Sequence, residues 1–255
     1  MTDAMPEPNR FTTFDGLSLA WYELAQGNTE PPIILHHGFS SSAYFEWVEC
    51  GIADAVIGLG RRVIALDARG HGSSDKPHEA RFHGRDLMER DLMELVTSLD
   101  IATYDLVGYS MGGGIAARVA AKDNRVRRVV ISGVGEGIVT GNVAFSGKAL
   151  AAAFRAESDD GLSEIERNMR NGAISRNNDL LALAAHCEVI SFPPVDLAAI
   201  TADTLVMAGD TDPLAQRPEA IADPIAQSRL VIVPGDHWHS KRSPEFRAAL
   251  TDFLS

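Results

Sequence analysis

The sequence predicts an α/β fold in which a mostly parallel sheet is covered by helices on both faces. Through most of the chain, short apolar segments of strand character alternate with helical segments, and short connections join them. A Gly-x-Ser-x-Gly motif at residues 108–112 lies between one such strand and the helix that follows it. The alternation stops between about residues 135 and 195, where the sequence contains helical stretches and no convincing buried strand.

The elements before residue 135 follow from their local patterns. Asp15-Gly16 is a turn sequence between two short β-type runs, so we expect a hairpin there. From Arg85 to Leu99, apolar residues recur at helical spacing and acidic residues occupy the other side, which predicts a core-packing helix with a solvated acidic face. In chain order we expect strands at 10–13, 17–23 and 33–35, a helix at about 43–59, a strand at 62–66, a helix at 85–99, a strand at 104–107, a helix at 115–121 and a strand at 127–132.

The interruption after residue 134 predicts a division of the chain. We expect an α/β core formed by residues 1–134 and 196–255, and a helical cap formed by residues 135–195 over the face that carries the Gly-x-Ser-x-Gly turn. The alternative is a set of ordinary packing helices with no role in substrate selection. The expected cap helices lie at 142–156, 163–171 and 178–190, and the core resumes with strands at 204–208 and 229–233 and helices at 218–226 and 243–254.

Composition excludes several classes of function. The chain has 255 residues, of which 45% are hydrophobic and 23% charged, as in ordinary globular proteins. Its formal net charge of −12 argues against nucleic acid and anionic membrane surfaces as partners. The N-terminus lacks the features of a secretory signal, and no stretch is long and apolar enough to span a membrane, so we expect a cytoplasmic protein. Cys50 and Cys187 are far apart, in no metal-binding spacing, and are expected to be reduced and structural.

Ser110 is the candidate nucleophile. A strand that leads directly into Gly-x-Ser-x-Gly, with a helix immediately after it, is the context that a nucleophile elbow requires. Gly108 and Gly112 remove the Cβ atoms that such a turn would press together. The helix N-terminus after Ser110 also directs backbone N–H groups towards any anion formed there.

A base and a carboxylate are expected from two later loops, each directly after a predicted strand. A serine hydroxyl needs a base within hydrogen-bond reach and an acid to orient that base. We prefer Asp212 over Asp210 as the acid, because Asp212 lies further into its loop and Asp210 is placed to brace the turn. We prefer His237 over His239 as the base, because His237 follows the strand more closely. The His-x-His pair has no third ligand cluster elsewhere, so we expect no metal and no cofactor.

Two backbone N–H groups are expected to form an oxyanion hole. One belongs to Met111, the residue after the nucleophile, and the other to Phe39, in the loop after the strand at 33–35. His37 is expected to brace that loop through its ring nitrogens, and His71 to stabilise a turn. Phe145 and Trp238, together with Phe154, are expected to supply an apolar wall to the substrate pocket, and the alternative for each of them is a place in the hydrophobic core.

Five motifs together are specific to one superfamily. They are His37-Gly38-Phe39, Asp67-x-Arg69-Gly70-His71-Gly72-x-Ser74, Gly108-Tyr-Ser110-Met-Gly112-Gly113, Gly209-x-x-Asp212 and Gly235-x-His237. In these motifs the chain resembles the α/β-hydrolase superfamily over nearly its whole length. The resemblance implies an eight-stranded sheet, a catalytic triad of Ser110, His237 and Asp212, and a lid inserted after the sixth strand. A serine at the nucleophile position speaks against the haloalkane dehalogenase and epoxide hydrolase branches, and the chain is most similar to small capped esterases, lactonases and C–C bond hydrolases.

We therefore expect a serine hydrolase that cleaves a carboxylic ester or lactone of a small-molecule substrate through an acyl-enzyme. The alternatives are a C–C bond hydrolase of a vinylogous diketo acid, a cofactor-free perhydrolase and a ligand receptor without turnover. The first alternative needs a cationic or hydrogen-bonding site for the substrate carboxylate. The candidate residues for that site are Arg118, Arg155, Arg167, Arg170 and Arg176. The acyl group, the leaving group and the oligomeric state are left open.

Overall fold

The computed structural model describes residues 5–27, 29–141, 146–190 and 193–255. They contain an eight-stranded sheet with the strand order β1-β2-β4-β3-β5-β6-β7-β8. β2 pairs antiparallel with β1 and β4, and the remaining neighbours are parallel, which confirms the expected sheet. The strands are β1 Asn9–Thr12, β2 Ser18–Ala25, β3 Thr29–His36, β4 Arg61–Leu66, β5 Tyr104–Tyr109, β6 Val126–Ser132, β7 Asp203–Gly209 and β8 Ser228–Val233.

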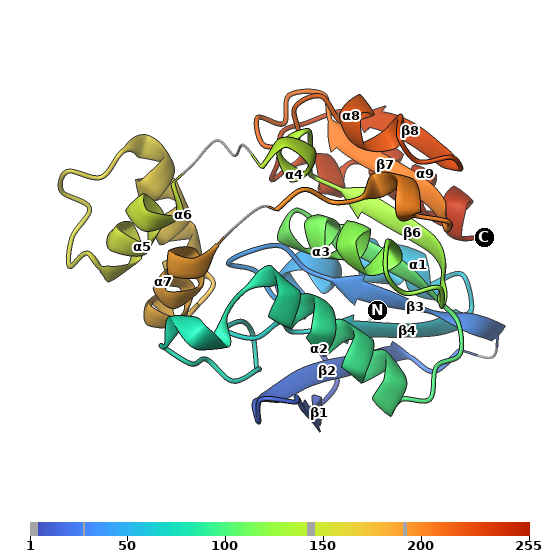
Figure 1. Cartoon of the computed structure of the whole chain (residues 1–255), viewed down its shortest axis with the longest axis horizontal. Helices are drawn as coiled ribbons and strands as arrows, with labels where there is room; N and C mark the ends of the chain where they lie inside the picture. The colour runs from blue at the N-terminus through green and yellow to red at the C-terminus, as the bar shows by residue number, and fades with distance from the viewer. Residues whose placement is uncertain (1–4, 28, 142–145, 191–192) are drawn as a thin grey trace.

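Helices cover both faces of the sheet (Figure 1). Apolar residues alternate between the faces along β3: Ile34 packs with α2, α3 and α8, whereas Ile33 and Leu35 pack with α1 and α9. The α-helices are α1 Ile52–Ile57, α2 Arg85–Ser98, α3 Met111–Ala120, α4 Gly137–Thr140, α5 Gly147–Arg155, α6 Glu164–Ser175, α7 Leu180–Val189, α8 Glu219–Ala222 and α9 Pro244–Leu254. Short turns of other helix types lie at η1 Tyr44–Val48, η2 Ala80–Phe82, η3 Leu197–Ala199 and η4 Ser240–Arg242.

The described part of the segment between β6 and β7 contains helices α4 to α7 and no strand. Helices α5, α6 and α7 stand at one end of the molecule in Figure 1, away from the sheet and the helices that cover it. They share an apolar core of their own, which includes Leu150, Phe154, Ala173, Leu183 and Cys187. No helix among the described residues has the length and apolar character that crossing a membrane would require.

Two local expectations are wrong. The single helix expected at about 43–59 is divided into η1, a turn of π-helix, and α1, because Gly51 between them adopts a φ of 70°. The acidic face of α2 is not wholly solvated, since Glu89 and Asp91 are only 2% and 1% exposed. Glu89 pairs with Arg118 and Lys122, and Asp91 pairs with Arg69. Cations from neighbouring elements therefore compensate these carboxylates inside the protein.

A buried ion cluster lies near the starts of the central strands, at the edge of the sheet opposite Ser110. Asp105, near the start of β5, is fully buried. Its carboxylate lies 2.7 Å from Arg61 of β4 and 2.6 Å from Arg127 of β6. Arg61 also donates to the carbonyl oxygen of Leu254 at the end of α9. The cluster therefore joins three strands and the last helix.

We predict that Asp105→Asn lowers the free energy of unfolding by about 3–5 kcal/mol, because it leaves the buried guanidinium of Arg61 without a carboxylate. Urea unfolding followed by circular dichroism measures the change. The Michaelis parameters of the folded variant should equal those of the wild type, since the cluster is remote from Ser110. An unchanged unfolding midpoint would contradict the prediction.

Candidate active site

Ser110 lies at a tight turn between β5 and α3. Its backbone has φ 55° and ψ −116°, a conformation that residues other than glycine rarely adopt. The turn is tight because the chain segments around it approach each other closely. A Cβ atom on Gly108 would lie 2.1 Å from the carbonyl oxygen of Gly112, and one on Gly112 would lie 2.0 Å from that of His36. The two glycines that flank Ser110 are therefore required by packing.

Three loops that are distant in the sequence bring Ser110, His237 and Asp212 together. The Nε2 atom of His237 lies 2.9 Å from the Oγ atom of Ser110. The Nδ1 atom of the same ring lies 2.8 Å from Oδ2 of Asp212. The other carboxylate oxygen of Asp212 accepts backbone N–H groups from Leu214 and Ala215. With Nδ1–H donating to Asp212, Nε2 is free to accept the hydroxyl proton of Ser110.

The two neighbouring residues weighed for these positions make other contacts. Asp210 Oδ1 accepts the N–H of Gly235 at 2.8 Å and so joins the ends of the two loops. The side chain of His239 is 75% exposed and pairs with Asp236. Neither residue contacts the Ser110–His237 pair in the hydrogen bonds of the described chain, so the geometry favours Asp212 and His237.

The loop after β3 lies directly against Ser110. A Cβ atom on Gly38 would lie 3.3 Å from the Cβ atom of Ser110. His37 braces this loop, as expected, because its Nδ1 atom lies 2.7 Å from the carbonyl oxygen of Gly38 and its Nε2 atom accepts the N–H of Ala68 at 3.0 Å. Since Nε2 is an acceptor, Nδ1 carries the proton and donates to the carbonyl of the peptide whose N–H belongs to Phe39. The orientation of that peptide is therefore fixed by His37.

Of the two expected oxyanion donors, Met111 begins α3, where N–H groups have no intrahelical acceptor. The other, Phe39, follows a residue whose own N–H is already used, because Gly38 donates to Oε2 of Glu46 at 2.9 Å. In this loop Phe39 is thus the next N–H available to an anion beside Ser110.

Sequence reasoning missed three residues around this site, namely Glu46, Tyr109 and Lys241. Glu46 is buried and forms an ion pair with Lys241. The hydroxyl of Tyr109 donates to the carbonyl oxygen of His237 at 2.6 Å. Burial raises the pKa of Tyr109 well above its ordinary value, so this hydroxyl stays protonated. The available signal was a single acidic residue within the aromatic and apolar run Tyr44–Val48.

The three residues expected to line the substrate pocket differ in their placement. Phe145 lies outside the described residues. Trp238 is 47% exposed, and its ring meets that of His237 edge to face at 5.6 Å between centroids. Phe154, in α5, is buried and packs against Phe39 with ring centroids 5.9 Å apart. Trp238 therefore borders the candidate base, and Phe154 packs against the loop that carries Phe39, a candidate oxyanion donor.

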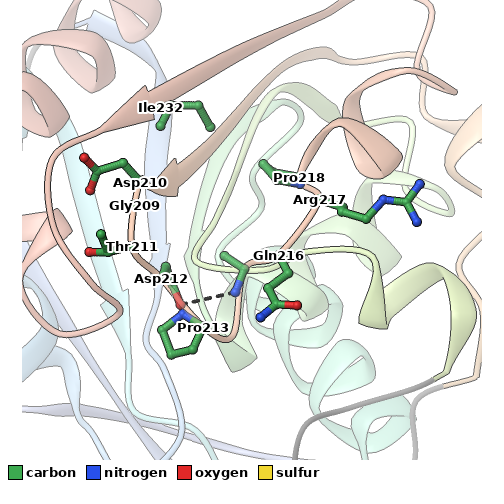
Figure 2. Close-up of a pocket in the computed structure, with 10 residues that line it drawn as sticks. Gly209, Asp210, Thr211, Asp212, Pro213, Gln216, Arg217, Pro218 and Ile232 are labelled. Atoms are coloured by element: carbon green, nitrogen blue, oxygen red, sulfur yellow. Dashed lines mark hydrogen bonds between the residues drawn. The ribbon is translucent and has the colours of Figure 1, made fainter.

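A cavity of about 470 Å³ lies beside the loop that carries Asp212. Figure 2 shows that its lining comes mostly from this loop, between β7 and α8, with Ile232 contributed by β8. A second cavity, of about 290 Å³, is bordered by Ser41 and Ser42 of the β3 loop and by Arg176 after α6. Both cavities adjoin loops that hold candidate site residues.

Three of the five arginines considered as binding partners for a substrate carboxylate already form ion pairs within the protein. Arg118, Arg155 and Arg170 pair with Glu89, Glu188 and Asp159. Arg167 and Arg176 have no carboxylate within 4.0 Å among the described residues. Arg176 alone of this set lines one of the two cavities described above.

Comparison with known proteins is consistent with this architecture. Residues 31–149 match the family model of the alpha/beta hydrolase fold. The sn-1-specific diacylglycerol lipase ABHD11 of Danio rerio is 26% identical over 290 residues, which cover 100% of this chain and 84% of the relative.

Solved structures are similar over almost their whole length. A hydrolase from Pseudomonas aeruginosa PA01 has a TM-score of 0.80 at 24% identity and covers 98% of both chains. The enol-lactonase from Burkholderia xenovorans LB400 has a TM-score of 0.77 at 21% identity, over 96% of this chain and 99% of its own. At these identities the likeness establishes the fold.

We predict that Ser110→Gly is more stable than Ser110→Ala by about 1 kcal/mol, because only glycine adopts the backbone conformation at this turn without strain. Elsewhere glycine destabilises a folded protein through its greater freedom in the unfolded chain, so the sign is diagnostic. Denaturant unfolding of the two variants measures the difference. Greater stability of the alanine variant would show that the turn is unstrained.

Proposed function

Because the chain belongs to the α/β-hydrolase superfamily, we propose that it is a serine hydrolase that cleaves carboxylic esters, lactones included, through an acyl-enzyme on Ser110. The observation that carries the proposal is the pair of contacts from Ser110 to His237 and from His237 to Asp212, at 2.9 and 2.8 Å. A hydroxyl, an imidazole and a carboxylate in this order form the arrangement that activates a serine towards a carbonyl carbon.

In the first half of the reaction, Ser110 Oγ attacks the carbonyl carbon while His237 Nε2 takes the hydroxyl proton. The negative charge that develops on the carbonyl oxygen is stabilised by the N–H groups of Phe39 and Met111. Asp212 holds the imidazole in the required tautomer and stabilises the imidazolium. His237 then donates its proton to the leaving alcohol oxygen, which leaves the acyl group on Ser110.

In the second half, His237 removes a proton from water, and the resulting hydroxide attacks the acyl carbon. The same two N–H groups bind the second oxyanion, and the proton returns to Ser110 Oγ as the acid is released. For a lactone substrate, the alcohol and acid products are one hydroxy acid.

We further propose that residues 135–195 act as a cap that shapes the substrate site. The support is the position of Phe39, whose ring stacks on His186 of α7 at 5.2 Å and packs against Phe154 of α5. Helices of this segment thereby touch the residue that we assign to the oxyanion hole. An ester or lactone needs no cation for recognition. Of the five arginines considered, Arg118, Arg155 and Arg170 pair with carboxylates, whereas Arg167 and Arg176 contact backbone carbonyl groups.

We predict that the wild type releases p-nitrophenol from short to medium acyl esters and that Ser110→Ala lowers kcat by about 10⁶-fold or to the limit of detection. Loss of the nucleophile removes the acyl-enzyme, whereas the fold is retained. Absorbance assays over an acyl chain-length series measure turnover, and fluorophosphonate labelling reports an activated serine. If the wild type neither turns over nor labels, Ser110 is not an activated nucleophile and the proposal fails.

We predict that Asp212→Asn lowers kcat by about 10⁴-fold, because the amide cannot fix the His237 tautomer or stabilise the imidazolium. Asp210→Asn is the matched control, two residues away on the same loop, and should retain near wild-type kcat. Steady-state kinetics on one p-nitrophenyl ester compare the two. A larger loss in the Asp210 variant would exchange the assigned roles.

A further inference from the structure

Glu46 is a buried carboxylate beside the loop that lies against Ser110. The residue belongs to η1, a wide turn in which Glu49 N–H donates to the carbonyl oxygen of Tyr44. Its side chain is 2% exposed, and Oε2 accepts the N–H of Gly38 at 2.9 Å. The peptides on both sides of Gly38 are thus fixed, one by Glu46 through its N–H and the other by His37 through its carbonyl.

A negative charge at this place opposes the reaction unless a cation compensates it, because an oxyanion forms only one residue away from Gly38. Lys241 supplies the cation by pairing with Oε1 of Glu46. Burial by itself would raise the pKa of Glu46. The charge of Lys241, its hydrogen bond and the hydrogen bond from Gly38 outweigh burial, so the pKa lies below its usual range and Glu46 is ionised.

The ion pair also reaches the loop that carries the base. Lys241 belongs to η4, and its ammonium lies 4.5 Å from the centroid of the Tyr109 ring. Tyr109 directly precedes Ser110, and its hydroxyl holds the carbonyl of His237 and lies 3.1 Å from Ser240 Oγ. One chain of contacts therefore runs from Gly38 through Glu46, Lys241 and Tyr109 to His237.

We propose that Glu46 positions the oxyanion loop against Ser110 by accepting the N–H of Gly38, and that Lys241 neutralises this buried carboxylate. Tyr109, on whose ring Lys241 packs, tethers the loop that carries His237. Stability alone does not account for the pair, since well-packed apolar residues of similar volume commonly replace a buried ion pair without loss. What an apolar pair cannot supply is an acceptor for the N–H of Gly38. This inference rests on the proposed serine-hydrolase function and assigns Glu46 and Tyr109 positioning roles.

The test compares two double variants that differ only in that acceptor. Glu46→Gln/Lys241→Met keeps an amide oxygen for Gly38 and leaves no buried charge. Glu46→Leu/Lys241→Met removes the acceptor as well. We expect the first to stay within about 3-fold of wild-type kcat and the second to lose about 10–100-fold, with KM unchanged in both, because a misplaced donor weakens only the transition state.

Fluorophosphonate inactivation gives a second readout, since the phosphonate oxygen of the adduct occupies the position of the oxyanion. Its second-order rate constant should fall in the Leu/Met variant by the same factor as kcat and recover in the Gln/Met variant. Asp105→Asn is the control for a buried ion pair remote from the site. It should lower the unfolding midpoint and leave kcat, KM and the labelling rate unchanged.

Tyr109→Phe, which deletes one oxygen atom, covers the case in which the Leu/Met variant does not fold. It should lower kcat by about 10-fold with KM unchanged, because the His237 backbone loses its tether. Equal kcat values for the two double variants, or wild-type kcat in Tyr109→Phe, would overturn the positioning role while the wild type still labels. Failure of the wild type to label would instead overturn the proposed function itself.

Discussion

The close approach of α3 to the ends of β3 and β5 is the constraint on which the site depends. The turn at Ser110 exists only because Gly108 and Gly112 let three backbone segments meet where any Cβ atom would overlap a carbonyl group. The resulting strain at Ser110 is maintained by the packing of the fully buried α3 against the sheet. The hydroxyl of Ser110 is thereby held at the C-terminal edge of the sheet by β3, β5 and α3, which pack directly against one another.

The parallel sheet brings His237 and Asp212 to Ser110. β5, β7 and β8 run in the same direction, so the loops after them emerge at one edge, and residues 127 positions apart in the chain meet within hydrogen-bond distance. The C-terminal ends of β5, β7 and β8 carry the candidate site residues, and the Asp105 cluster lies near the starts of β4, β5 and β6, which it joins to α9. The candidate site and the buried ion cluster therefore lie at opposite edges of the sheet, and β5 contributes to both.

Local patterns were sufficient for the fold, the elbow and the order of the candidate triad. All strands except β1 contain a short apolar run, and the turn glycines, Ser110, Asp212 and His237 stand at predictable offsets from strand ends. Contacts between distant charged residues could not be predicted in this way. Glu46 and Lys241 are 195 residues apart, and nothing in either local pattern indicates the other. The burial of Glu89 and Asp91 was missed for the same reason, because the cations that compensate them belong to other elements. The Gly51 break in the helix expected at about 43–59 depends on one backbone torsion angle, which hydrophobic spacing does not report.

The ring contacts of Phe39 link the candidate site to the helical segment between β6 and β7. The backbone of this residue is a proposed binding group for charge, and its ring is held between His186 and Phe154 of the helical segment. An outward movement of α5 or α7 would remove these ring contacts, whereas the peptide between Gly38 and Phe39 would still be held by His37. Under the proposed function, the oxyanion donors would stay in place while ligands exchange with solvent, and closure of the helical segment would serve to shield the bound substrate from bulk water.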